Sequence, residues 1–171
     1  HMGTLLVGIL CQSTEGFAAT TFYVVVYVFT SLGAFAVIAS LAGDHGEPMT
    51  FDQWRGLGYR HPLRCGVLVL LLLSLAGLPA TAGFMAKFAV FHAALQAGYI
   101  GLLLIGVFAS VISFAFYLRV TMLFFQRDEQ AYRWHQGSVF EHTVLAVCSS
   151  AVLLLGLFPG LLFDLIRHIL P

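Results

Sequence analysis

The sequence predicts an all-α fold, a polytopic transmembrane helical bundle with one partial and about four full spans. Hydrophobic residues make up 60% of the 171 residues and charged residues only 9%, and the mean hydropathy is +0.93. A water-soluble fold could not hide this much apolar surface. Between the polar connections, the apolar stretches are long enough for spans of about 20 residues each.

The apolar segments are predicted to form a single membrane domain over residues 1–171. The first is too short to cross a membrane and resembles the end of a helix that begins upstream, although an opening His-Met pair can also be left by cloning. The last ends at Pro159-Gly160 and leaves a short amphipathic tail. The predicted spans lie near residues 2–10 (partial), 17–42, 62–95 (broken), 99–125 and 140–158.

The segment 62–95 is too long to be one straight span, because a continuous helix of that length would measure about 50 Å against a hydrocarbon core of about 30 Å. Gly77, Pro79 and Gly83 lie near its middle. Pro79 lacks a backbone donor and its ring crowds the preceding turn, so a helix should kink or unwind there. We therefore predict one span broken at Gly77-Pro79.

Charge and cysteine usage exclude several classes of function. The formal net charge is zero, and without a basic patch nucleic-acid binding is not expected. The cysteines Cys11, Cys65 and Cys148 are far apart in apolar surroundings, without the spacing of a metal or iron–sulfur site. The sequence contains no Gly-rich phosphate loop or nucleophile elbow. We expect no metal, no bound cofactor and no redox site in this chain.

The arginines predict how the chain is oriented. If the segments alternate, most arginines fall on one side and only Arg167 falls on the other, and the positive-inside rule places the arginine-rich side in the cytoplasm or matrix. The C-terminus is then predicted to be periplasmic in a bacterial inner membrane, or to face the intermembrane space in a mitochondrial inner membrane. The arginines on the first side are Arg55, Arg60, Arg64, Arg127 and Arg133.

Lys87 is the strongest candidate for a functional residue, and it is the only lysine in the sequence. A lysine inside a membrane segment costs about 2.5–3.5 kcal/mol on insertion scales and persists mainly where it is used or paired. It follows the predicted break, and broken helices are where transporters place ion sites. Burial disfavours the charged amine, which suits a proton relay. The alternative is a lysine that snorkels to the interface.

Other polar groups are weaker candidates. His92 lies about 140° from Lys87 around an ideal helix, so the two do not share a face; it is either a relay or an interfacial residue. Ser110, Ser113 and Tyr117 form a stripe that could scaffold water or simply join helices. A similar stripe, for which packing is favoured over holding water, contains Tyr23, Tyr27, Thr30 and Ser31.

Three motifs resemble a known family. SLAGLPATAGFMAKF at residues 74–88, FYVVVYVFTSLGAFAVIA at residues 22–39, and the opening HMG are similar to the antiporter-like membrane subunits of NADH–quinone oxidoreductase, respiratory complex I. Lysine rather than glutamate at position 87 is most similar to subunit N, called subunit 2 in mitochondria. YLRV at residues 117–120 and the closing LLGLFPGLL also fit, so the resemblance covers essentially the whole chain.

The resemblance implies a fourteen-helix protein of two inverted repeats, of which this chain would keep the end of helix ten and helices eleven to fourteen. Lys87 would exchange protons towards the periplasmic or intermembrane side. NADH, FMN, iron–sulfur clusters and quinone would be handled by other subunits, and the neighbouring partners would include subunit M. The earlier charged residues of the family's path would lie upstream of His1. Ala80 and Ala86 depart from the family, where proline and glycine are frequent.

These features support one leading function and two alternatives. The leading interpretation is a proton-translocating membrane subunit that couples quinone reduction elsewhere in the complex to proton pumping, with Lys87 as the buried carrier on the exit side. One alternative is a subunit of a multisubunit sodium/proton antiporter, which resembles the same family. The other is a non-conducting membrane scaffold whose lysine pairs with a carboxylate of a neighbouring subunit.

Overall fold

The structure is a computed structural model that describes residues 1–40, 54–126 and 139–169. Within these ranges all of the regular structure is helical. The helices are α1 (Met2–Leu10), α2 (Thr14–Ser40), α3 (Leu57–Arg60), α4 (Pro62–Ala76), α5 (Ala82–Gln96), α6 (Ile100–Leu123), α7 (Val139–Leu157) and α8 (Gly160–Ile169). The predicted all-helical class is confirmed for this part of the chain.

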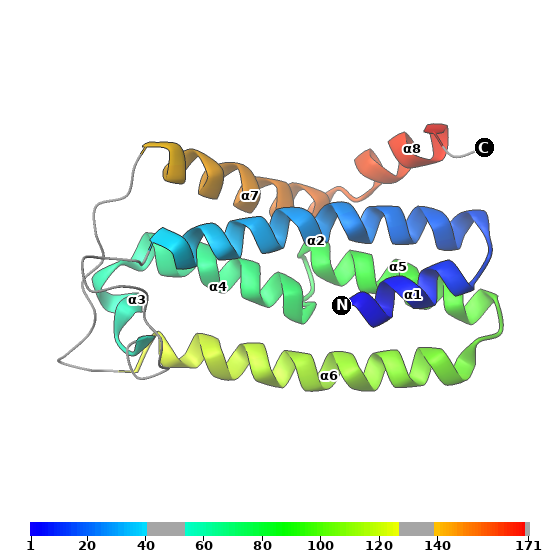
Figure 1. Cartoon of the computed structure of the whole chain (residues 1–171), viewed down its shortest axis with the longest axis horizontal. Coiled ribbons are helices and arrows are strands. Elements are labelled where there is room, and N and C mark those ends of the chain that lie inside the picture. The colour runs from blue at the N-terminus through cyan, green and yellow to red at the C-terminus, as the bar shows by residue number, and fades with distance from the viewer. Residues whose placement is uncertain (41–53, 127–138, 170–171) are drawn as a thin grey trace.

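The helices form an elongated bundle around α2 (Figure 1). Helices α4 and α5 follow one another along α2, and α1 packs against both α2 and α5. On the other side of α4 and α5 lies α6, whereas α7 and α8 cover the opposite side of α2 (Figure 1). Both halves of the interrupted segment therefore lie between α2 and α6.

Among the described residues, two helices are long and apolar enough to cross a membrane, namely α2 with 27 residues and α6 with 24. A third span results if the bent pair His142–Leu157 and Gly160–Ile169 is counted as one, and α4 is a shorter apolar helix. The chain is therefore a helical membrane protein, whereas the number of about four full spans stays a prediction.

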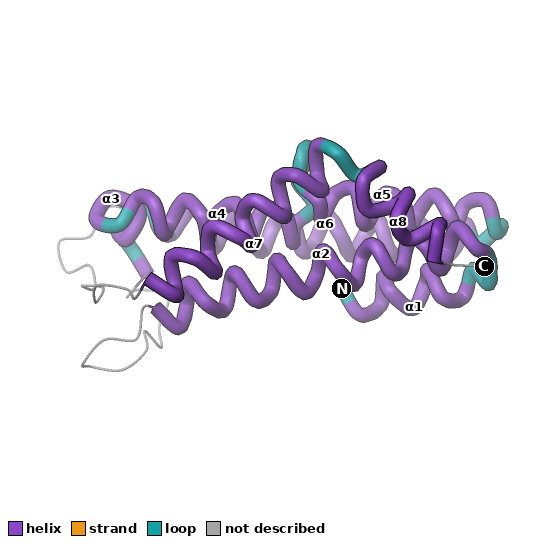
Figure 2. Tube along the Cα trace, turned by 90° about the horizontal axis from the view of Figure 1, so that it is seen from above, coloured by secondary structure: helices purple, strands orange, loops and turns teal. Residues whose placement is uncertain are grey.

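The predicted interruption of the segment 62–95 is confirmed, since α4 ends at Ala76 and α5 begins at Ala82. A second interruption was not predicted. The sequence predicts that the last segment ends at Pro159-Gly160, but a further helix, α8, begins there after a bend of 86° (Figure 2). It packs on α2, where the rings of Phe163 and Phe22 stack at a centroid distance of 4.4 Å. The tail is thus a docked helix.

Arginines lie at both ends of the bundle. Arg60 and Arg64 flank the start of α4, and Arg167 lies in the last turn of α8. Burial, followed by the charges of Arg64 and Arg60, lowers the pKa of His61 between them. That imidazole is therefore neutral at neutral pH, and the charge here comes from the arginines. Arg127 and Arg133 lie outside the described residues, so the orientation stays a prediction.

Candidate functional site

The end of α4 is closed by glycine at the position where the sequence predicts a break. Gly77 has a φ of +90°, a left-handed conformation that favours glycine. Its N–H donates to the Ser74 carbonyl at 3.0 Å, and the Leu78 N–H donates to the Leu73 carbonyl at 2.9 Å. This pair of bonds is a Schellman motif. It satisfies two of the last four carbonyls of the helix and leaves those of Leu75 and Ala76.

Lys87 satisfies the two remaining carbonyls from the next helix. Its Nζ donates to the Leu75 carbonyl at 2.9 Å and to the Ala76 carbonyl at 3.1 Å. The side chain is only 7% exposed, because α5 carries it back across the break. Lys87 therefore caps α4 and is buried within the bundle. Its depth in the membrane stays a prediction.

The electrostatics of this position combine two opposing effects. The C-terminal end of a helix carries partial negative charge, which stabilises an ammonium group placed there. Burial removes the same group from water and disfavours its charge. No carboxylate among the described residues is paired with Lys87. The partial negative charge at the end of α4 thus stabilises the ammonium group of Lys87, as a carboxylate would in an ion pair.

Two more contacts hold the halves of the broken helix together. The Gly83 N–H donates to Ser74 Oγ at 3.1 Å, and Thr81 Oγ1 donates to the Leu78 carbonyl at 2.6 Å. A Cβ at Gly83 would overlap the carbonyl oxygen of Ser74. The start of α5 therefore lies directly against the backbone of α4, at the point where Lys87 reaches across.

Replacing Ser74 by alanine is expected to destabilise the break. Ser74 is fully buried, and without its hydroxyl the Gly83 N–H loses its acceptor, a loss of about 1–3 kcal/mol. Thermal unfolding of the purified complete protein measures the effect. Ser110→Ala is the matched control, because Ser110 Oγ donates only within its own helix, to the Gly106 carbonyl. Equal unfolding temperatures for both variants would contradict this role of Ser74.

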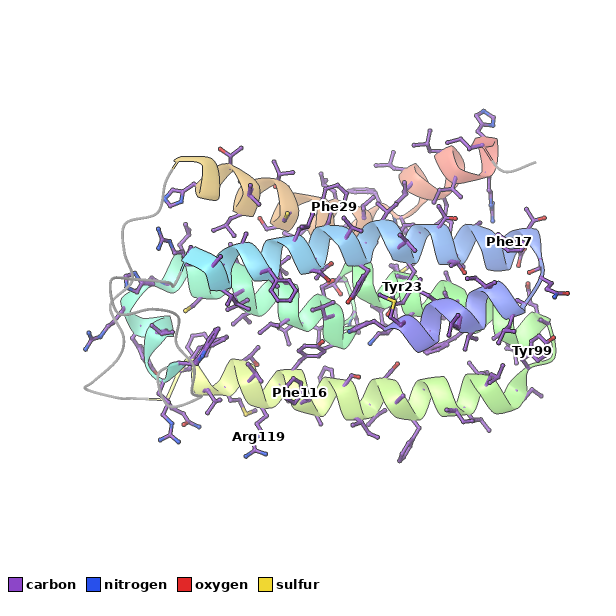
Figure 3. All side chains as sticks on the ribbon, in the orientation of Figure 1. Phe17, Tyr23, Phe29, Tyr99, Phe116 and Arg119 are labelled. Carbon is purple, nitrogen blue, oxygen red and sulfur yellow. The ribbon has the colours of Figure 1, made fainter. Side chains whose placement is uncertain are left out.

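A small cavity adjoins Lys87 on the side of α1 and α2. Its volume of about 10 Å³ suits about one water molecule. His1 lies beside it, with Nδ1 at 2.8 Å from Tyr23 Oη and Nε2 at 3.4 Å from Tyr117 Oη. In Figure 3, Tyr23 lies between α2 and α1, whereas Arg119 points away from the bundle. The cavity is lined by His1, Tyr23, Val26, Tyr27, Thr30, Ser74, Leu75, Gly83, Ala86 and Lys87.

Sequence reasoning missed two members of this cluster. His1 is interpreted from the sequence as the end of a helix, and packing is favoured over holding water for the stripe that contains Tyr23. Both interpretations were incomplete, because the side chains of His1 and Tyr23 meet beside Lys87. These contacts join residues 22 and 116 positions apart, so no local pattern in the sequence predicts them.

The three polar residues predicted to form a stripe on α6 do not share one cavity. Tyr117 reaches His1, whereas Ser110 lines a larger apolar cavity of about 320 Å³ between α5 and α6 that Lys87 also borders. Ser113 borders neither of these cavities. The structure thus does not unite the three-residue stripe of α6 in one water path.

His92 lies away from Lys87, as its position on the helix predicts. It is exposed, its ring stacks on that of Phe88 at 6.3 Å, and it borders a groove of about 320 Å³ together with Glu15 and Arg167. This groove, between α2, α5 and α8, is at the end of the bundle opposite the arginines of α3 and α4.

Comparison with known proteins places this arrangement in a family. Residues 1–113 match the family model described as NADH:quinone oxidoreductase/Mrp antiporter, TM. Subunit N of the NADH-quinone oxidoreductase of Rhodococcus opacus (strain B4) is 41% identical over 167 residues, which cover 96% of this chain and 31% of that protein. Subunit N of Syntrophotalea carbinolica is 37% identical over 171 residues, 100% of this chain and 37% of that protein.

Solved structures share the fold. Respiratory complex I from Thermus thermophilus matches with a TM-score of 0.80 and 29% identity, over 94% of this chain and 36% of the matched chain. The Mrp complex from Dietzia sp. DQ12-45-1b matches with a TM-score of 0.81 and 21% identity, over 95% and 38%; at that identity the match supports the fold alone. The chain spans about a third of the length of these relatives. It belongs to the NADH:quinone oxidoreductase/Mrp antiporter transmembrane family, and these sequence relatives are subunit N of NADH-quinone oxidoreductase.

Proposed function

We propose that this chain is part of a proton-translocating membrane subunit of NADH–quinone oxidoreductase, and that Lys87 is its buried proton carrier on the exit side. The observation that carries this proposal is the position of Lys87 Nζ, held by two carbonyls at the end of a half-helix beside a cavity lined by titratable groups. The names of the sequence relatives support the choice of complex.

The two hydrogen bonds of Lys87 suit a group that gains and loses a proton. An ammonium group has three N–H donors, and a neutral amine has two donors and one lone pair. Leu75 and Ala76 accept two N–H bonds, so both protonation states can keep them. The third position is then free to exchange a proton without breaking the cap.

The cluster of His1, Tyr23 and Tyr117 supplies a proton donor or acceptor for this exchange. Histidine changes charge near neutral pH, and one ordered water in the adjoining cavity would connect the imidazole and hydroxyl groups to the amine. In this proposal the redox reaction takes place in other subunits of the complex, which bind NADH and quinone. The partners are the other membrane subunits, including one that resembles subunit M.

Removing the Tyr23 hydroxyl is expected to slow proton translocation. Tyr23→Phe keeps the ring but loses the oxygen that lies 2.8 Å from His1 Nδ1, so the imidazole loses the group that orients it. The measurement is the ratio of protons moved to NADH oxidised in membrane vesicles. Tyr59→Phe is the control, because Tyr59 is 62% exposed and lies at the far end of the bundle. An unchanged ratio of protons moved to NADH oxidised in both variants would show that Tyr23 takes no part in proton transfer.

The antiporter alternative shares the fold, as the likeness to the Mrp complex indicates. The two functions differ in their driving force and in their ion. We expect vesicles containing the complete protein in its complex to take up protons when NADH is supplied, at the same rate with and without sodium. Proton movement that requires a sodium gradient and ignores NADH would support the antiporter and overturn the proposed function.

A further inference from the structure

The bend between α7 and α8 lies against the break between α4 and α5. Gly156 is buried near the end of α7, and a Cβ at this position would lie 2.6 Å from the Ala80 carbonyl oxygen, 2.6 Å from the carbonyl carbon of Thr81 and 2.7 Å from the Ala82 nitrogen. All three neighbours are backbone atoms, which cannot rotate away as a side chain can. Two interrupted helices thus meet backbone to backbone, and only glycine fits at the contact.

The backbone that Gly156 contacts sets the position of Lys87. Thr81 is the N-cap of α5, and Ala80 has a φ of +71°, an uncommon conformation for a residue with a side chain. Lys87 follows on the same rigid helix. A Cβ on Gly156 would have to move this turn by about 0.8 Å to reach ordinary contact distance. A shift of this size along the Nζ···O directions would lengthen the contacts of 2.9 and 3.1 Å beyond hydrogen-bond range.

Helix α7 is fixed on both sides of this contact, so it has little room to yield. Cys148 of α7 packs so closely on α2 that its Cβ would be 2.8 Å from a Cβ at Gly33. Beyond the bend, Phe163 of α8 stacks on Phe22 of the same helix α2. The turn between α4 and α5 is therefore the part that would give way.

We infer that Gly156 is a positioning residue for Lys87. The contact of Gly156 with Ala80–Ala82 holds the start of α5 in the position from which Lys87 Nζ reaches the end of α4. The bent pair α7–α8 therefore helps to position Lys87. This inference rests on the proposed function of Lys87.

Gly156→Ala in the complete protein tests the inference. We expect the ratio of protons moved to NADH oxidised to fall at least twofold, and the pH profile of proton movement to shift by at least half a pH unit, because the amine loses acceptors that affect its protonation. Gly66→Ala in α4 and Gly101→Ala in α6 are matched controls, since a Cβ at either position has no atom within 4 Å. A purely structural role would lower the amount of protein but leave the pH profile unchanged.

The other outcomes are assigned as follows. Lys87→Ala is measured in parallel: wild-type pumping by that variant would overturn the proposed function itself. Loss of pumping in Lys87→Ala with a wild-type ratio and pH profile in Gly156→Ala would overturn only the inference. If Gly156→Ala does not accumulate, Ala80→Gly is combined with it, because glycine lets the strained turn adapt. Partial recovery with a shifted pH profile supports the inference, and failure of both to accumulate assigns the contact to folding and overturns it.

Discussion

Lys87→Ala in the complete subunit is expected to stop proton transfer through this site. Removing a positioned acid–base group slows proton transfer by about 10²–10⁴-fold, and alanine also leaves the Leu75 and Ala76 carbonyls without the donor that caps them. The rate of proton movement per NADH oxidised is the measurement. Wild-type pumping in this variant would contradict the role of Lys87.

Lys87→Arg separates the relay from the cap. Arginine keeps a positive charge and several donors for the carbonyls at the end of α4, but it does not deprotonate in proteins. We therefore expect the variant to assemble better than Lys87→Ala and still to fail in proton transfer. If Lys87→Arg pumps as well as the wild type, then Lys87 is a structural cap of α4 and is not the proton carrier.

Gly83→Ala is expected to have the largest effect on stability among single-methyl changes at the break. Its Cβ would overlap the Ser74 carbonyl oxygen and lie 2.9 Å from Ser74 Oγ. Overpacking of this kind costs about 1–3 kcal/mol, and here the separation of α4 from α5 would also weaken the Lys87 cap. Both the thermal unfolding temperature and the amount of assembled protein should fall.

Gly66→Ala is the control for this variant because it adds the same methyl group to α4, at a position where a Cβ meets no atom within 4 Å. Alanine also has the higher helix propensity, so the control should be neutral or slightly stabilising. Equal stability of Gly83→Ala and Gly66→Ala would show that the two half-helices are not in the close contact that positions Lys87.

The break and the burial of Lys87 could be predicted from the sequence because both depend on local chemistry. Gly77 and Pro79 close together disfavour a continuous helix, and a lysine in an apolar segment is costly unless it has a partner. The identity of that partner could not be predicted. It depends on the Schellman motif at Gly77, which leaves two particular carbonyls open, and on the angle at which α5 returns to α4.

The contacts of His1 and the formation of helix α8 could not be predicted from local sequence patterns, for different reasons. His1 meets Tyr23 and Tyr117 from far along the chain, and nothing in the spacing of these residues predicts that they converge. Pro159 and Gly160 are typical of the end of a helix. They do end α7, but the chain then forms α8, which packs on α2 through the rings of Phe163 and Phe22.

The protonation of Lys87 itself is the most direct test of the relay. In the complete subunit labelled with ¹³C-lysine, the side-chain signal of Lys87 is identified as the one missing from the spectrum of Lys87→Arg, and it is followed across the working pH range of the complex by NMR. We predict that this signal moves between the positions of an ammonium and a neutral amine within that range. A signal that remains at the ammonium position throughout would contradict the relay and identify Lys87 as a permanent cap of α4.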